Sequence, residues 1–260
     1  MKSIARLAAG LAGAAMATAA IAAAPLYVAL AVVPVYVTMA VASPDRPDAD
    51  KQRDDGRKPA ETIAFSGMKP GQVVADFLPG TGYYDRIFSG VVGPKGHVYA
   101  FYTAEMKAFS KSPLPADGTK PFEKFDNVTS ISTPANDFAA PAPLDLVWIS
   151  DNYHDLHDPF FAPADVAKVN AAVFKALKPG GIYLVLDHAA PAGSGLTDTN
   201  TTHRIDEAVV KTEVEAAGFQ LVGESDALRN PADDHTKLVF DPSVRGHTDQ
   251  FILKFRKPKA

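Results

Sequence analysis

The eight residues from Asp151 to Asp158, DNYHDLHD, combine two imidazoles with three carboxylates. An imidazole titrates near neutral pH, and an adjacent carboxylate can orient its ring and stabilise its protonated form, so this run suits proton transfer. The same donor types bind transition metals, although the run lacks a compact spacing such as His-x-x-x-His. A polar loop whose Asp and Asn side chains cap the next helix is the third interpretation. The run by itself leaves all three open.

A second informative run is Asp76-Phe77-Leu78-Pro79-Gly80-Thr81-Gly82, which follows an apolar stretch and precedes a helical one. Glycine lets the backbone turn sharply and lets a ligand approach the amide groups at a helix N-terminus. A single Gly-x-Gly pair also occurs in ordinary strand-to-helix turns. This run therefore favours neither a nucleotide-like ligand nor a plain turn until its surroundings are considered.

The elements that must position these runs alternate between short β-rich stretches and helical ones from residue 61 onward. We predict strands at Val73–Phe77, His97–Tyr102, Val128–Ser132, Leu144–Ser150, Ile182–Asp187, Gln220–Ser225 and Gln250–Arg256. Helices are predicted at Tyr83–Val92, Asp165–Leu177 and Thr202–Ala217. The polar stretch Asn230–Thr248 lacks the apolar spacing of a crossover helix, so the last two strands should pair antiparallel. This order predicts an α/β domain with a mostly parallel sheet and helices on both faces.

Three further runs lie in a set order along these elements. They are Gly93-Pro94-Lys95-Gly96 before the second strand, Leu144-Asp145-Leu146-Val147-Trp148 in the fourth, and Ala176-Leu177-Lys178-Pro179-Gly180-Gly181 entering the fifth. With the glycine turn, this set resembles the class I S-adenosylmethionine-dependent methyltransferases over residues 61 to 257. The runs 152–157 and 249–255 resemble an exported branch of predicted methyltransferases. The resemblance implies a Rossmann-like seven-stranded sheet with a reversed last strand, and S-adenosylmethionine at the carboxyl ends of the first strands.

The resemblance also implies a set of cofactor contacts, with two departures from the family pattern. Leu78 occupies the place of the first of three glycines, and Tyr102 stands where the family has a carboxylate for the ribose hydroxyls. Glu105 either reaches back to replace that carboxylate or is a surface residue. Asn136 or Asp137 matches the position that contacts the adenine. The expected cofactor-binding residues are Asp76, Gly80, Gly82, Tyr102, Glu105, Asp137 and Asp151.

The loop after the fourth strand would face the cofactor, and this context favours a catalytic role for it. We predict that His154 is a general base, that Asp155 or Asp187 orients its ring, and that Tyr153 lines the acceptor pocket. His188 and His203 are expected at the same edge of the sheet. A metal site is the less favoured interpretation, and no metal is predicted. The polar stretch before the last strand is either a lid that carries Arg229 and Arg245 toward an anionic substrate or a loop with internal ion pairs.

The N-terminal 42 residues carry charge only at Lys2 and Arg6, which is the pattern of an export signal. Small residues at Ala40 and Ala42 predict cleavage after Ala42, and an uncleaved membrane anchor is the alternative because the apolar run is long enough to span a bilayer. We expect a signal peptide at 1–42, a polar linker at 43–60 and the methyltransferase-like domain at 61–260. The protein should be exported and periplasmic, or else anchored in the inner membrane.

Composition excludes several functions. With 260 residues and no cysteine, the chain has no disulfide, thiolate metal site or cysteine nucleophile. A net charge of −4 without a long Lys/Arg run argues against nucleic acid as a partner. The predicted function is methyl transfer from S-adenosylmethionine to an unidentified small molecule. The alternative is an exported ligand-binding protein that keeps the fold without methyl transfer, because S-adenosylmethionine is a charged cytosolic metabolite.

Overall fold

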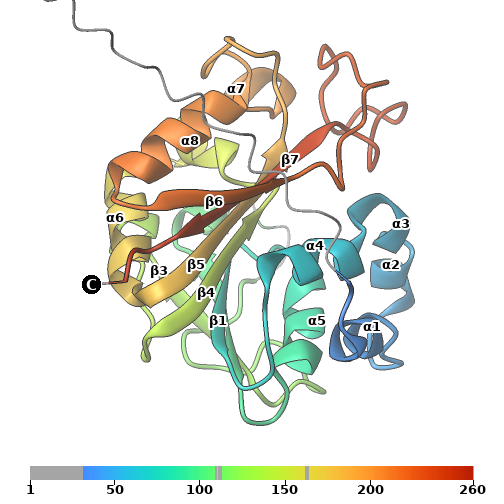
Figure 1. Cartoon of the computed structure of the whole chain (residues 1–260), viewed down its shortest axis with the longest axis vertical. Coiled ribbons are helices and arrows are strands. Elements are labelled where there is room, and N and C mark those ends of the chain that lie inside the picture. Colours follow the sequence, from blue (N-terminus) through green and yellow to red (C-terminus); the bar gives the residue numbers. More distant parts are fainter. Residues whose placement is uncertain (1–31, 109, 111–112, 162–163, 260) are drawn as a thin grey trace, which may run out of the picture.

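Seven strands form one sheet in the order β3-β2-β1-β4-β5-β7-β6 (Figure 1). The computed structural model describes residues 32–108, 110, 113–161 and 164–259. The strands are β1 Val73–Phe77, β2 His97–Thr103, β3 Val128–Thr133, β4 Leu144–Ser150, β5 Leu177–His188, β6 Gln220–Ser225 and β7 Gln250–Arg256. Only β7 runs antiparallel to its neighbours β5 and β6, and the other neighbouring pairs are parallel. The predicted Rossmann-like sheet with a reversed last strand is confirmed.

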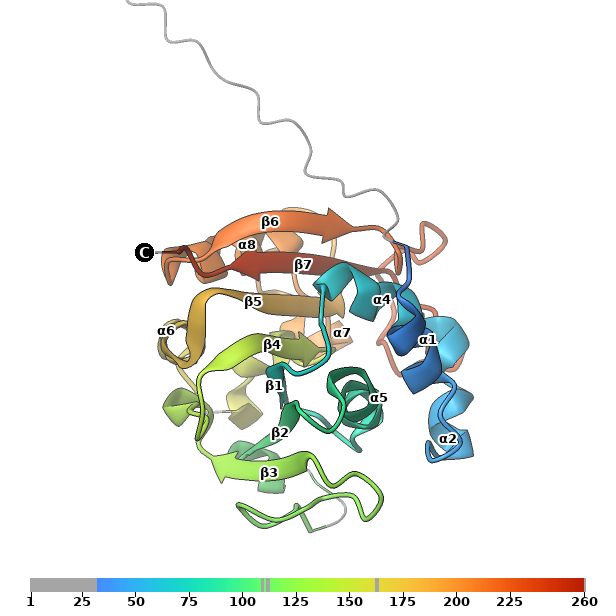
Figure 2. The ribbon, with the colours of Figure 1, turned by 60° about the horizontal axis from the view of Figure 1, so that its bottom comes forward.

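Helices cover both faces of this sheet (Figure 2). They are α1 Val35–Val41, α2 Asp48–Lys51, α3 Asp54–Arg57, α4 Pro59–Ser66, α5 Tyr83–Val92, α6 Val166–Ala176, α7 Thr199–Thr202 and α8 Glu207–Ala216. Short 3₁₀ helices follow three of the strands: η1 Glu105–Ala108 after β2, η2 Ala135–Asp137 after β3, and η3 His154–His157 with η4 Pro159–Phe161 after β4. The first group, α1, α4 and α5, packs on one face, whereas α6 and α8 pack on the other.

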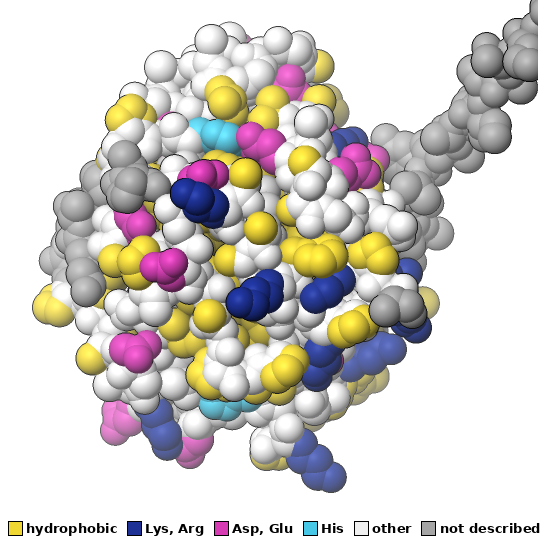
Figure 3. Space-filling view, turned by 90° about the vertical axis from the view of Figure 1, so that its left-hand side faces the viewer, with side chains coloured by type: hydrophobic (Ala, Val, Ile, Leu, Met, Phe, Trp, Pro, Cys, Tyr) yellow, Lys and Arg dark blue, Asp and Glu magenta, His cyan; other side chains and the backbone are white. Residues whose placement is uncertain are grey.

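The core follows from side-chain alternation along buried strands. In β4, Val147 and Ile149 pack toward α6 and α8, whereas Leu146 and Trp148 pack toward α5. Both faces of a mostly parallel sheet are covered, so its strands read as nearly continuous apolar runs. On the face shown in Figure 3, acidic and basic side chains are interspersed with hydrophobic ones.

Two elements differ from their predicted bounds by more than one residue. Strand β5 begins at Leu177, which pairs with Leu144 across an irregularity in the β4–β5 register. The predicted helix Thr202–Ala217 is interrupted, because His203 adopts a left-handed conformation with φ of 54° and ends α7. Helix α8 starts again after Asp206, whose carboxylate accepts a hydrogen bond from the Ala208 N–H at 3.0 Å.

Residues 43–60 differ from the expected solvated linker, because they contain α2 and α3 and pack on the domain. The Arg46 side chain is buried and pairs with Asp54 at 2.6 Å, and Asp50 pairs with Arg86 of α5 at 2.8 Å. Alternating charges are typical of a linker, but here they pair with one another and with the domain. That pairing offsets the cost of burying them.

Most of the predicted signal segment lies outside the described residues, so export stays a prediction. Its described part includes α1, where Val37 and Ala40 are buried against α4 and α5. The Tyr36 hydroxyl donates a hydrogen bond to the Met68 carbonyl at 3.1 Å. Among the described helices, each is too short or too polar to cross a bilayer.

Candidate functional site

The carboxyl ends of β4 and β5 bring together the polar side chains that the sequence singled out. Asp151 follows β4 with a left-handed backbone, φ 58°. Arg57 donates to its Oδ2 at 2.8 Å, and Gln250 of β7 donates to its Oδ1 at 2.6 Å. Burial would raise the pKa of Asp151, but the Arg57 guanidinium and nearby His188 lower it below its ordinary value. Asp151 is therefore a carboxylate that joins the N-terminal segment to the sheet edge.

His154 lies beside Asp187, the penultimate residue of β5. The His154 backbone N–H donates to Asp187 Oδ2 at 2.8 Å, and its ring Nδ1 lies 2.8 Å from Oδ1. Both side chains are buried. Burial alone would lower the pKa of His154, but the carboxylates of Asp187 and Asp155 raise it well above its ordinary value. This pair fixes the ring and directs its other nitrogen, Nε2, outward from Asp187.

Two further side chains surround His154 Nε2. Asp155 Oδ1 lies 3.2 Å from it and His203 Nδ1 lies 3.1 Å from it, while 3.5 Å separates those two partner atoms. Asn152 donates to the other oxygen of Asp155 at 2.8 Å. Burial raises the pKa of Asp155, but hydrogen bonds from His154 and His203 lower it overall. The predicted convergence of these side chains on one place is found, and their catalytic role stays a prediction.

Tyr153, expected to line the acceptor pocket, lies elsewhere. Its side chain is wholly buried, and its hydroxyl lies 3.0 Å from Glu213 of α8 and 2.8 Å from Asn170 of α6. Residues before and after a turn of 3₁₀ helix point in different directions, so Tyr153 enters the α6–α8 layer while His154 turns to the sheet edge. Tyr153 anchors the loop rather than lining a pocket beside His154.

The expected cofactor edge holds two buried carboxylates. Asp76 of β1 and Asp85 of α5 are both buried between the sheet and α5, close to Tyr102 of β2. Burial raises the pKa of both well above the usual range, and for Asp76 the Asp85 charge raises it further against an opposing effect of Arg57. Within the described chain, neither oxygen of Asp85 has a hydrogen-bond partner. An uncompensated buried carboxylate is costly and points to a missing cationic or donor group.

The turn between β1 and α5 leaves room at one glycine and none at the other. Gly80 has φ of 57°, and within the described residues nothing lies within 4 Å of the position that a Cβ would take. At Gly82 the Phe122 ring lies 1.9 Å from that position, so Phe122 uses the missing side chain. Leu78 adopts the left-handed conformation, φ 65°, with its side chain in the core. Leu78 thus keeps the backbone shape expected of a glycine.

The three remaining cofactor predictions differ in placement. Tyr102 is buried below Asp76 and Asp85, where burial raises its pKa, and it offers a hydroxyl where a carboxylate was expected. Both oxygens of Glu105 lie within 3.3 Å of the Ala135 N–H, so Glu105 ties η1 to η2. Asp137 is exposed on η2, whereas Asn136 accepts a hydrogen bond from the Asp165 N–H at 2.8 Å.

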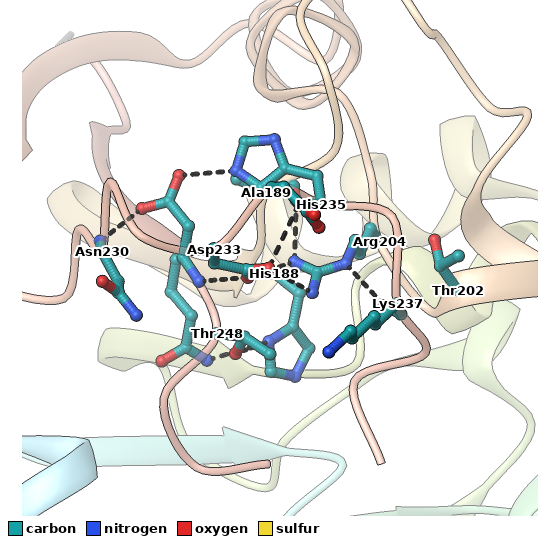
Figure 4. Close-up of polar contacts among 12 residues, drawn as sticks. His188, Ala189, Thr202, Arg204, Asn230, Asp233, His235, Lys237 and Thr248 are labelled. Carbon is teal, nitrogen blue, oxygen red and sulfur yellow. Dashed lines mark hydrogen bonds and ion pairs between the residues drawn. The ribbon is translucent and has the colours of Figure 1, made fainter. Parts of the chain in front are cut away.

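The polar stretch before β7 is fastened to the sheet edge by Arg204 (Figure 4). The wholly buried Arg204 guanidinium pairs with Asp233 at 2.9 Å and donates to the backbone carbonyls of Ala189 and Lys237 at 3.2 Å each. Arg229 pairs with Glu207, which favours an internal ion pair over a cation aimed at a substrate for that side chain, and Arg245 is exposed.

Sequence reasoning missed Arg57, Asp85 and Arg204. A signal existed for Asp85, because it lies three residues before Phe88 and seven before Val92 and therefore shares the buried face of the predicted helix. A carboxylate on an apolar helix face indicates a partner or a ligand. Arg57 lies in a charge-rich stretch typical of a linker, which hid its contact with Asp151.

Comparisons with known proteins agree with the geometry. No family model matches the chain. Over 198 residues it is 30% identical to the ubiquinone/menaquinone biosynthesis C-methyltransferase UbiE of Vibrio vulnificus. That match covers 74% of this chain and 65% of the relative, so the chain spans less than two thirds of the relative's length.

Solved structures share the fold at low sequence identity. A SAM dependent methyltransferase from Aquifex aeolicus matches with a TM-score of 0.50 at 18% identity, covering 82% of this chain and 98% of that one. The [4+2]-cyclase SpnF matches with a TM-score of 0.52 at 16% identity, covering 82% of each chain. The chain therefore has the class I methyltransferase fold, and the curated relatives that it matches in sequence are methyltransferases.

Proposed function

We propose that the protein transfers a methyl group from S-adenosylmethionine to a small molecule that the chain does not identify. The observation that carries this proposal is the buried carboxylate pair of Asp76 and Asp85 beside the open backbone of Gly80. The sequence relationship to a C-methyltransferase supports it. The fold alone would not, because a cyclase shares it.

The residues at this edge fit the proposed cofactor. S-adenosylmethionine carries an ammonium and a sulfonium, and the two carboxylates offer the negative charge that a cation needs in a buried place. Gly80 leaves its backbone accessible, and α5 begins two residues after Thr81 with the N–H groups of a helix end facing the turn. Arg57 lies close enough to Asp76 to lower its pKa, so both charge signs are available for the cofactor's amino acid end.

When bound, the cofactor supplies a methyl carbon already activated by its positively charged sulfur. The chain's residues then have to align the acceptor and take up any proton that it loses. We assign this second task to the cluster at the β4–β5 edge. Its centre is His154, whose Nδ1 is bound to Asp187 and whose Nε2 is directed toward Asp155 and His203.

Calorimetry of the full-length protein with S-adenosylmethionine tests the cofactor directly. We expect the wild type to bind the cofactor and Gly80→Val to bind it about tenfold more weakly or worse. A tenfold loss corresponds to about 1.4 kcal/mol of binding free energy. The new side chain would fill the space next to the turn that the ligand needs.

Gly71→Val is the matched control. Gly71 also has a positive φ, 81°, and open space at its Cβ position, but it lies in the turn before β1, at the opposite end of the strand. In both variants a valine has to adopt the left-handed backbone conformation, which costs a similar strain energy of about 1–2 kcal/mol. Equal affinities of the two variants would place the cofactor elsewhere, and absence of binding by the wild type at millimolar ligand would remove it from the proposal.

A further inference from the structure

The side chains around His154 lie at distances that fit hydrogen bonding and also fit metal coordination. Three donor atoms, His154 Nε2, Asp155 Oδ1 and His203 Nδ1, lie 3.1, 3.2 and 3.5 Å from one another. Ligand atoms about 2.1 Å from one metal ion, at angles between about 90° and 110°, lie roughly 3.0–3.4 Å apart. The three separations are therefore close to those of ligand atoms on one triangular face of a metal coordination sphere.

The tautomer of His154 is set by its surroundings. Asp187 is wholly buried and accepts hydrogen bonds from the backbone N–H groups of His154 and His188, at 2.8 and 2.7 Å. Because a carboxylate only accepts, the ring Nδ1 that lies 2.8 Å from it carries the hydrogen. In the neutral ring, Nε2 then presents its lone pair to the other two donors. A carboxylate behind the far nitrogen of a histidine ligand is the usual support of a metal-bound imidazole.

The other ligand candidates are also held in place. Asn152 donates to Asp155 Oδ2 at 2.8 Å, which leaves Oδ1 directed at the two imidazoles. The His203 ring stands nearly perpendicular to the His154 ring, with centroids 5.3 Å apart, and its Nδ1 faces inward. Its side chain is 23% exposed, so solvent or a small molecule can reach this side of the cluster.

An independent observation comes from Asp158, three residues beyond Asp155. Its side chain is 3% exposed and lies near the Thr199 side chain, but neither of its oxygens makes a hydrogen bond of good geometry in the part of the chain that the structure describes. With Asp155 and Asp187, it makes three carboxylates around two imidazoles that are neutral when they act as ligands. When both imidazoles are neutral, a bound cation would offset this buried negative charge.

We propose that His154, Asp155 and His203 bind one divalent first-row transition-metal ion. Two imidazoles and one carboxylate suit zinc, iron, cobalt or nickel rather than magnesium or calcium. Three protein ligands leave at least one coordination position open, as in catalytic rather than structural metal sites. In the metal-bound protein, His154 Nε2 is a ligand and not a base, and the ion acidifies an oxygen that binds at the open position. Only the acidification of the bound oxygen rests on the proposed function.

Cobalt is the probe for the test, because the visible absorption of Co²⁺ reports its coordination. The full-length protein, stripped with a chelator, is titrated with Co²⁺ without S-adenosylmethionine. We expect one ion per chain and a loss of affinity of at least about 100-fold in His203→Ala, since removing a ligand costs no less than removing a supporting residue. His203 is partly exposed and lies at the end of a short helix, so this variant should fold, which its melting temperature checks.

His157→Ala is the control, because His157 lies in the same short helix but contacts Glu213, at 3.2 Å. It should bind Co²⁺ as the wild type does. Wild-type protein that takes up no Co²⁺ at micromolar concentration, or His203→Ala that binds as tightly as the wild type, would overturn the site. Because calorimetry of the metal-free protein with S-adenosylmethionine is a separate measurement, either proposal can fail while the other stands.

Discussion

Asp85 shows at the scale of one residue what the proposed cofactor site costs in stability. Its carboxylate is wholly buried near a second carboxylate, Asp76, and Tyr102, and Arg86 is the cation that opposes the effect of burial. In an unfolded chain, both aspartates titrate near the ordinary pKa of 3.8. The folded chain therefore binds protons more tightly than the unfolded chain.

The sign of the resulting pH dependence follows from the raised pKa. The stabilising contribution of a protonated Asp85 is complete below about pH 4 and is lost as the pH rises through the raised pKa of the folded state. We expect Asp85→Asn to be more stable than the wild type at pH 7, by about 1–2 kcal/mol, with a smaller difference at pH 4. Urea unfolding at several pH values measures this. The same substitution should weaken S-adenosylmethionine binding by about 10–100-fold, because it removes a charge-assisted contact.

Asp126→Asn is the comparison variant for this series. Asp126 is exposed and pairs with Lys120, so its substitution should leave the unfolding curves and cofactor affinity unchanged. If Asp85→Asn is less stable than the wild type at pH 7, then the carboxylate has a partner in solution that offsets its burial.

Among single residues, sequence reasoning located His154, Asp155, Asp187 and His203 because parallel strands end at the same edge of a sheet. It could not give the direction of Tyr153, since the direction of a side chain in a 3₁₀ turn depends on packing against α6 and α8. It also overlooked Asp85, whose helical position was predicted but whose missing partner is a property of the folded core.

The loop between β6 and β7 is the element whose position depends most clearly on one buried contact. Arg204 and Asp233 form an ion pair with both side chains at most 1% exposed. Removing one partner leaves the other charge buried and unpaired, which costs about 3–5 kcal/mol. We expect Arg204→Met to lower stability by this amount and to speed proteolytic cleavage within 230–248, as limited proteolysis with mass spectrometry would show.

Lys237→Ala is the matched control for the loop. Arg204 contacts the Lys237 backbone carbonyl, and that acceptor survives the substitution. The Lys237 ammonium itself contacts Ser243 on the exposed outside of the loop. Cleavage of Lys237→Ala as fast as of Arg204→Met would mean that the loop is held by its outer contacts rather than by the buried pair.

Elements with a strong apolar pattern could be predicted closely. The bounds of β1, β4, β6, β7 and α5 agree residue for residue with the prediction, because buried strands and an amphipathic helix carry dense local signals. Lys178 and the following Pro-Gly-Gly predict a break before β5. The strand nevertheless begins earlier, because pairing with Leu144 and with β7 outweighs that local preference. Residues 43–60 could not be predicted as helical, since their order depends on charge pairs with α5 and Asp151.

At the scale of the whole molecule, the N-terminal helices act as part of the domain. Helix α1 packs against α5 so closely that a Cβ on Gly90 would lie 2.9 Å from the Ala40 side chain. We expect Val37→Ala to destabilise the protein by about 1–3 kcal/mol, because Val37 is wholly buried between helices. Val35→Ala, two residues away and 72% exposed, should change the melting temperature little. Equal effects of the two variants would show that α1 does not pack as described.

The packing of α1 also bears on the predicted cleavage of the N-terminal segment. Ala42, the predicted cleavage position, caps the C-terminus of α1. Its N–H donates a hydrogen bond to the Thr38 carbonyl at 3.0 Å, and the Ser43 N–H donates one to the Ala40 carbonyl at 3.3 Å. Peptidases cut locally unfolded backbone, and although Ala42 is exposed, its backbone is held in a helix end that packs on the domain. Cleavage at this bond would therefore compete in time with folding, and a chain that folds first would keep the bond intact. The rate at which α1 docks on α5, rather than the residues around Ala42, would then decide which form of the protein accumulates.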